Sequence, residues 1–223
     1  TTAHDEVVAA TMASFVDREP LVRVRVVVAN WDELLHRLRR REVDFFVAET
    51  STLDREPDLD VEVLTPHPVY FIARRGHPLA RRNVAPADTF GYPFLALTRY
   101  PPRVLQPMLA SRPGDAPPGR PFPAMEIGSL AAAKRIVVNS DAIVPLMLPC
   151  VAQELGERTL VPLGTAPWLY TRYGFVSLKG QALGAAACAV RDRLRDAEAA
   201  LVREEAQLIA RHGSKRSPAT RKA

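Results

Sequence analysis

The side chains of this sequence that could do chemistry are better suited to holding a small anion than to breaking bonds. Arg99 follows an apolar stretch at residues 94–97, and a guanidinium can bind a carboxylate through two parallel hydrogen bonds. Thr1 and Thr2 stand at the start of the first predicted helix, where backbone N–H groups and the helix dipole favour negative charge. Ser129 precedes a later predicted helix and could offer a ligand its hydroxyl. We therefore predict a ligand-binding site that includes Thr1, Thr2, Asn30, Trp31, Thr98, Arg99, Gly128 and Ser129.

Each of these residues also has a structural interpretation, and the sequence leaves both open. Thr2, Asn30 and Ser129 precede predicted helices, where their side chains could serve as N-caps. Trp31 could pack in the core, and Arg99 could be a solvated loop residue. The positions still favour binding, because open α/β sheets hold ligands beyond the carboxyl ends of strands and next to helix N-termini.

The motifs of common enzyme classes are missing from the sequence. No GxSxG, HExxH, GxxxxGK[ST] or GxGxxG pattern occurs. Cys150 and Cys188 do not form a CxxC pair, and no two histidines have the spacing of metal ligands. No carboxylate stands in the apolar setting that acid–base catalysis needs. We therefore expect a protein that is not an enzyme and that uses no metal and no cofactor.

Composition indicates an ordinary globular protein. The chain has 223 residues, of which 47% are hydrophobic and 25% charged, enough for one large domain or two small ones. The net charge of +5 comes from residues 211–223, which contain five Lys and Arg residues and no acid. The neutral remainder does not favour a broad nucleic-acid-binding face.

The sequence also indicates where in the cell the protein is expected. No apolar run reaches about 18 residues, so we expect no membrane-spanning helix. Two cysteines suit a reducing, cytoplasmic setting. The first residues do not look like a signal peptide and lack an initiator Met, so we expect a fragment of a longer protein or a processed one.

Predicted strands and helices alternate along the chain, which indicates an α/β fold. A helix at residues 5–17 precedes a strand at 21–29, a helix at 33–41 and a strand at 43–48, and this β-α-β unit implies a parallel sheet. Further strands are predicted at 59–64, 69–74, 94–97, 142–148, 159–163 and within 168–178. Further helices are predicted at 129–138, 150–155 and 184–212, with a proline-rich loop at 112–123.

Four segments stand out in their order along the chain. They are residues 34–47 (LLHRLRRREVDFFV), 75–80 (RGHPLA), 136–146 (IVVNSDAIVPL) and 173–194. In this order, the first three segments are similar to the sequence patterns L…L..G.lDlai, hHPLA and lVaaGlGialvP of one protein family. The fourth segment is similar to the return helix of the same family. Together they resemble the effector-binding (regulatory) domain of LysR-type transcriptional regulators, which is related to periplasmic solute-binding proteins.

The resemblance implies a type II periplasmic-binding-protein-like α/β fold, with two Rossmann-like sub-domains joined by a two-stranded hinge. Residues 1–72 would form the first part of sub-domain I, and residues 73–170 would form sub-domain II. Residues 171–213 would return to sub-domain I, and residues 214–223 would be a basic tail.

The resemblance also implies a function. A small, often anionic effector in the inter-lobe cleft would change the hinge angle and the geometry of a homodimer or homotetramer. The first helix, with Val7, Thr11 and Met12, and the helix at 129–138 would be partner surfaces. DNA would be bound only through a winged helix-turn-helix absent from this chain. The alternatives are a solute-binding protein of a transport system and an enzyme on the same fold.

Overall fold

The computed structural model describes residues 4–82, 84–97, 99–114 and 121–213. Its contacts divide the chain into two compact units. Unit 1 contains Thr1–Pro66 and Thr171–Arg203, and unit 2 contains His67–Tyr170 and Glu204–Ala223. The last helix therefore contributes its final turns to unit 2, whereas the sequence assigned all of it to sub-domain I.

Unit 1 is built on a three-stranded sheet with the order β1-β8-β2. The central strand β8 (Tyr173–Leu178) is antiparallel to β1 (Phe46–Glu49) and to β2 (Leu59–Val63). A glycine is needed at Gly174 because a Cβ there would lie 2.6 Å from a backbone oxygen of β2. The returning strand thus joins the two strands contributed by the first part of the chain.

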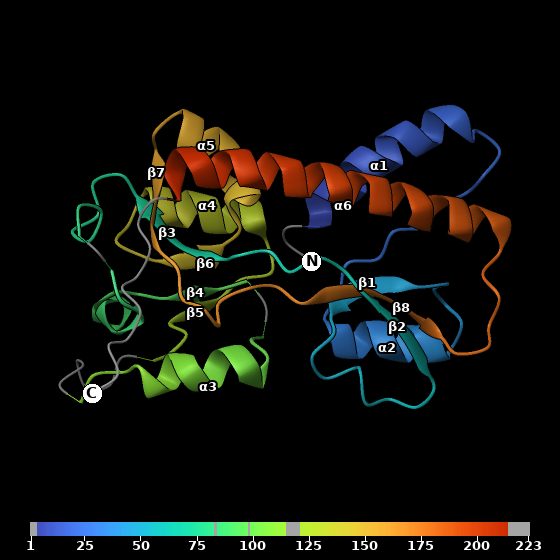
Figure 1. Cartoon of the computed structure of the whole chain (residues 1–223), viewed down its shortest axis with the longest axis horizontal. Helices are drawn as coiled ribbons and strands as arrows, with labels where there is room; N and C mark the ends of the chain where they lie inside the picture. Colours follow the sequence, from blue (N-terminus) through green and yellow to red (C-terminus); the bar gives the residue numbers. More distant parts are fainter. Residues whose placement is uncertain (1–3, 83, 98, 115–120, 214–223) are drawn as a thin grey trace. The chain divides into compact units, whose positions relative to one another are not determined.

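Three helices flank this sheet: α1 (His4–Arg18), α2 (Trp31–Arg39) and α6 (Ala185–His212). Figure 1 shows α2 on one face and α1 and the first part of α6 on the other. Leu34, Leu35 and Leu38 repeat at helical spacing and bury one side of α2 against the β1 core. The predicted partner face of α1 is instead buried in the chain, since Val7 is 7% and Thr11 is 3% exposed.

The turn after α2 has a left-handed residue. Arg41 has φ 58°, and the Glu42 N–H donates to the Arg37 carbonyl at 2.9 Å. This is the Schellman ending, whose left-handed position usually holds glycine. The chain therefore reaches β1 through a turn in which an arginine occupies a glycine conformation.

The predicted strand at residues 21–29 does not form a strand. The segment belongs to no ladder among the described strands. Its alternate valines remain open, with Val26 at 53% and Val28 at 61% exposure. The β-branched sequence favours an extended backbone, but a strand also needs a partner edge. No such edge pairs with the segment in the described part of the chain.

Unit 2 has a mixed sheet. Its strands are β3 (Tyr70–Arg74), β4 (Leu95–Ala96), β5 (Met125–Glu126), β6 (Val144–Leu146) and β7 (Leu160–Gly164). β3 lies between β6 and β7 and is antiparallel to both. A parallel bridge from Phe94 to Ile143 connects β6 with β4, and β4 is parallel to β5. The α/β class is confirmed, but the sheets are not wholly parallel.

The helical elements of unit 2 are η1 (Pro86–Gly91), α3 (Pro102–Ala110), α4 (Leu130–Val138), η2 (Leu148–Val151) and α5 (Ala152–Gly156). Within the unit, α4 lies on one side of the strands and α3 on the other (Figure 1). Val104 and Met108 of α3 pack into a core with Phe71 and Phe94, whose rings meet edge to face. α3 was not predicted from the sequence.

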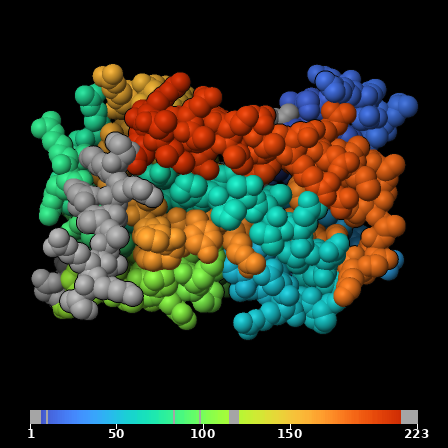
Figure 2. Space-filling model, viewed as in Figure 1, coloured from blue at the N-terminus to red at the C-terminus, as the bar shows by residue number. Residues whose placement is uncertain are grey.

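A single stripe of α6 is buried. Leu194, Leu201 and Leu208 stand seven residues apart and are 7%, 8% and 9% exposed. The opposite side of the helix faces solvent, as the orange to red atoms in Figure 2 show. In the final turns, Glu205 lies 2.9 Å from Nδ1 of His67, and both side chains are buried. This buried contact ties the end of α6 to unit 2.

Candidate ligand-binding site

Three predicted site residues, Arg99, Gly128 and Ser129, follow two paired strands of unit 2. The parallel strands β4 and β5 end side by side, and the Ile127 N–H donates to the Ala96 carbonyl at 2.9 Å. The chain then leaves β4 toward Arg99 and leaves β5 toward Gly128 and Ser129. Carboxyl ends of parallel strands are where α/β sheets bind ligands. These residues therefore follow strand ends of the kind at which α/β sheets bind ligands.

Ser129 both caps a helix and remains accessible. Its Oγ accepts a hydrogen bond from the Ala132 N–H at 3.3 Å, and its side chain is exposed. Gly128 is also exposed, and a Cβ at this position would meet no atom within 4 Å. The first N–H groups of α4 have no partners within the helix and point toward this loop. The loop can therefore present backbone donors to an anion.

Two arginines lie in the segment that follows β4. Arg99 is exposed, and Arg103 lies in the first turn of α3. Arg103 is held in place because its Nη2 donates to the Tyr170 carbonyl at 2.8 Å and its guanidinium stacks 4.4 Å from the Tyr170 ring centroid. The sequence analysis missed Arg103 together with its helix. The signal was Pro102, since proline is common in the first turn of a helix.

The two predicted site residues of unit 1 that the structure describes, Asn30 and Trp31, have different surroundings. Asn30 occupies the N-cap position of α2 and its carbonyl accepts from the Leu34 N–H, but its side chain makes no capping bond. That side chain is exposed. Trp31 is the first residue of α2 and packs, partly buried, against the core of unit 1. These contacts agree with the interpretation of Trp31 as a core residue.

A polar cluster at the end of β1 was not predicted. Thr50 is fully buried, and its N–H and Oγ1 both donate to the Arg172 carbonyl, at 2.8 and 3.0 Å. The Arg172 N–H donates to Glu49 at 3.1 Å, and Ser51 also donates to this carboxylate. These residues follow the carboxyl end of a strand, so the rule that selected Asn30 would have found them too.

Three predicted site residues, Thr1, Thr2 and Thr98, lie outside the described residues. Among the described residues, no group of three or more His, Cys, Asp or Glu side chains is arranged to hold a metal ion. No helix in the described ranges is both long and apolar enough to span a membrane. The β4–β5 edge offers an arginine, a hydroxyl and a helix N-terminus, which are groups of a kind that can bind an anion.

Several known proteins are similar to this chain in sequence or in fold. The family model described as LysR substrate binding domain matches residues 1–199. The SDS degradation transcriptional activation protein of a Pseudomonas strain is 32% identical over 194 residues, which is 84% of this chain and 61% of that protein. The transcriptional regulator CbbR of Sinorhizobium medicae is 35% identical over 69 residues, or 31% of this chain and 21% of that protein. The chain thus spans about three fifths of the first of these relatives.

Solved structures agree in fold. The MetR regulatory domain of N. meningitidis, a LysR family regulator, has a TM-score of 0.68 at 18% identity and covers 90% of this chain and 91% of its own. The CcmR regulatory domain of Synechocystis PCC6803, solved in complex with 2-PG, has a TM-score of 0.66 at 21% identity, with coverage of 86% and 91%. This family consists of binding domains of transcription regulators, so the expectation that the chain is not an enzyme is confirmed. By the match over residues 1–199, the chain belongs to the family of LysR substrate-binding domains.

Proposed function

We propose that this chain is the effector-sensing part of a DNA-binding transcriptional regulator. The family match over residues 1–199 is the observation that carries the proposal. The related Pseudomonas and Sinorhizobium proteins are both named as transcriptional regulators. The DNA-reading part would be a winged helix-turn-helix outside this chain, and the regulator would work in the cytoplasm as a homodimer or homotetramer. The transport alternative has no such support.

The effector we propose is a small anion bound at the β4–β5 edge. Arg99, Gly128 and the start of α4 at Ser129 support this, because they combine a cation with the backbone N–H groups of a helix N-terminus. The CcmR regulatory domain was solved with 2-PG, and the Pseudomonas relative is named for the degradation of SDS, an alkyl sulfate. SDS carries an anionic sulfate head. Thr1, Thr2, Asn30 and Thr98 are further proposed contacts.

Sensing would act by a shift in population. A ligand that binds one arrangement of the two units more tightly than another favours that arrangement by its difference in affinity. The favoured arrangement would then alter how copies of the regulator pack. DNA affinity would change by the same coupling free energy that links it to effector binding.

Calorimetry with matched arginine variants tests the anion site. The probes are 2-PG, small dicarboxylates, aromatic carboxylates and decyl sulfate below its micelle concentration. We expect Arg99→Ala to weaken the best probe by roughly 10- to 150-fold, since a hydrogen bond to a charged group contributes about 1.5–3 kcal/mol.

Arg75→Ala is the control. Arg75 is an exposed arginine that directly follows β3. β3 is antiparallel to β6, and β6 is bridged in parallel to β4, so Arg75 lies at the opposite edge of the sheet. Its loss should leave affinity within twofold. Equal affinities of both variants for the best probe would show that the β4–β5 edge is not the anion site.

A further inference from the structure

The first turn of α3 contacts the residue at which the chain leaves unit 2. Nη2 of Arg103 donates to the Tyr170 carbonyl at 2.8 Å, and the guanidinium lies 4.4 Å from the centroid of the Tyr170 ring. Tyr170 is the last residue of this part of unit 2, and Thr171 is the first residue of the part that returns to unit 1. Arg103 thus holds the chain at a boundary of the units through both its backbone and a side chain.

Unit 1 holds the same segment two residues further on. The Arg172 carbonyl accepts hydrogen bonds from the N–H and Oγ1 of Thr50, at 2.8 and 3.0 Å, and the Arg172 N–H donates to Glu49 at 3.1 Å. Only Thr171, whose side chain is buried, separates Tyr170 from Arg172. Because a residue has only two soft backbone dihedrals, a displacement of Tyr170 reaches Arg172 with few ways to be absorbed.

Tyr170 is also paired with the segment by which the chain enters unit 2. Pro68 forms an antiparallel bridge with Tyr170. The boundary that precedes Pro68 lies between Pro66 and His67. By holding Tyr170, Arg103 therefore acts on a pair of segments that both run to a boundary of the units.

On its other side, Arg103 is joined to the candidate anion site by a stiff stretch of chain. Pro101 and Pro102 stand between Arg99 and Arg103, and each proline restricts φ to a narrow range. The Val104 N–H donates to the Pro101 carbonyl at 2.9 Å, so the helical turn already begins at this residue. An anion that draws on Arg99 therefore pulls on the first turn of α3.

We propose, building on the anion site proposed above, that Arg103 is the positioning residue through which an anion bound at the β4–β5 edge acts on the boundary of the units. The anion shifts Arg99 and the first turn of α3, and Arg103 moves Tyr170 with that turn. The change then reaches Thr50 in unit 1 through the Arg172 carbonyl. Because the guanidinium of Arg103 is already engaged by Tyr170, Arg103 transmits the binding of the anion and does not hold the anion itself.

Hydrogen exchange in the 223-residue chain tests this transmission without DNA. The probe is whichever of 2-PG and the small dicarboxylates binds the chain best. At saturation it should change the exchange rates of the Thr50 and Arg172 amides by about threefold or more, since both amides donate in the bonds around Arg172. Arg103→Gln should bind the probe with an affinity within about twofold of the parent chain, yet show no change at either amide. Equal changes in both chains would overturn the proposal.

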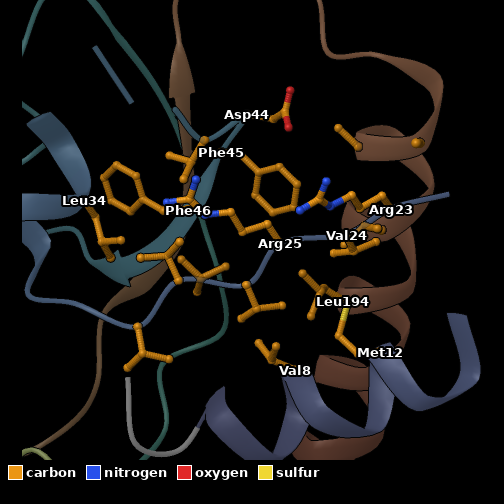
Figure 3. Close-up of a pocket in the computed structure, with 18 of the residues that line it drawn as sticks. Val8, Met12, Arg23, Val24, Arg25, Leu34, Asp44, Phe45, Phe46 and Leu194 are labelled. Carbon is orange, nitrogen blue, oxygen red and sulfur yellow. The ribbon is translucent and has the colours of Figure 1, made fainter. Parts of the chain in front are cut away.

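Decyl sulfate is left out of this experiment because its alkyl tail could act on unit 1 directly. Unit 1 has an apolar groove of about 600 Å³, around which Val8 and Met12 of α1, Leu194 of α6 and Leu34 of α2 lie (Figure 3). The hydrophobic effect favours the entry of an alkyl chain into such a groove. Small dicarboxylates carry no such tail, so a response to them in unit 1 is not explained by the groove.

Three further variants separate the contact from the general stability of α3. Tyr170→Phe keeps the ring and the backbone carbonyl that Arg103 contacts, so its response should equal that of the parent chain. Tyr170→Leu removes the ring and should weaken the response. Arg112→Gln is the control, because the Arg112 guanidinium lies 5.7 Å from the Phe90 ring centroid just beyond the other end of α3. A loss in Arg112→Gln as large as that in Arg103→Gln would overturn the role of Arg103.

In the complete gene product, the readout is the effect of the probe on DNA affinity. Arg103→Gln should reduce this effect by roughly threefold or more while the probe still binds, whereas Arg99→Ala should lose binding of the probe itself. An unchanged effect in Arg103→Gln would overturn the role of Arg103 and leave the proposed function standing. A tenfold loss of probe affinity in Arg103→Gln would instead place Arg103 in the binding site and contradict transmission. If no probe altered DNA affinity in the parent protein, the proposed function would fail together with this inference.

Discussion

The buried contact between His67 and Glu205 gives the sharpest quantitative prediction. Nδ1 of His67 lies 2.9 Å from Oε2 of Glu205, and the two residues are 1% and 5% exposed. His67→Leu leaves the Glu205 carboxylate buried without this partner. Leaving a buried hydrogen-bonding group without its partner costs about 1–3 kcal/mol. For a chain of this size, the melting temperature should fall by about 2–12 °C.

The double variant shows whether the loss comes from the pair. Replacing both residues by leucine removes the buried polar groups together, and such replacements are often neutral or stabilising. We therefore expect His67→Leu with Glu205→Leu to be less destabilised than the sum of the single variants, with an interaction free energy of about 1–3 kcal/mol. Glu204→Leu, at the adjacent exposed position, should change stability by about 0.5 kcal/mol or less.

Urea unfolding followed by circular dichroism measures all four variants. The slope with urea must stay the same for the free energies to be compared. An interaction free energy near zero, with the single variants simply adding, would refute the account of the pair. A loss in Glu204→Leu as large as that in His67→Leu would show that the end of α6 is sensitive to any change.

Three further predictions concern stability. Arg41→Gly should raise the free energy of unfolding by about 0.5–1 kcal/mol in urea titrations, because Arg41 holds φ 58°, a left-handed conformation that glycine adopts without strain; a loss of stability would contradict this. Burial lowers the pKa of His77 from 6.5, and its Nδ1 accepts from the Leu79 N–H. The unfolded chain then binds more protons, so this stabilisation is complete above about pH 6.5 and is lost as the pH falls through the folded-state pKa. The urea midpoint should drop between pH 7 and 5 less steeply in His77→Asn than in the parent chain, and equal slopes would refute the role of His77. Deletion of residues 214–223 should leave the melting temperature unchanged in scanning calorimetry, and a large fall would show that the tail is structural.

Much of the fold could be predicted because its elements carry strong local signals. The leucines of α2 and the seven-residue stripe of α6 repeat at helical spacing, and both helices lie within a few residues of their predicted bounds. The antiparallel pairing of β8 with β1 and β2 had no comparable signal. Pairing partners far apart in the sequence are set by tertiary contacts, which periodicity does not report.

Two local errors have physical causes. No element was predicted at α3, where Pro102 occupies the first turn and Pro107 lies inside a helix of only nine residues. The segment at residues 21–29 was predicted as a strand because β-branched residues favour extended backbone. This preference does not make a strand by itself, because a ladder also requires a neighbouring strand, and the segment has none among the described strands.

The candidate site stays a prediction, because the sequence could point only to the places where strands end. The rule that ligands bind beyond strand ends selected Arg99, Gly128 and Ser129, which the parallel pair β4–β5 brings to one edge. Arg103 and Thr50 were missed because their roles depend on contacts with Tyr170 and Arg172, which the chain reaches only after folding.

The most direct test of the central claim measures DNA affinity of the complete gene product with and without an anionic effector. DNA fragments would be selected from a genomic library by the complete protein, and the effector would be the probe that binds this chain best. If the protein senses the effector, saturating effector should change the DNA affinity by about 5- to 150-fold or change the DNA footprint. The Arg99→Ala variant should lose this response. Unchanged affinity and footprint, with the effector demonstrably bound, would contradict it.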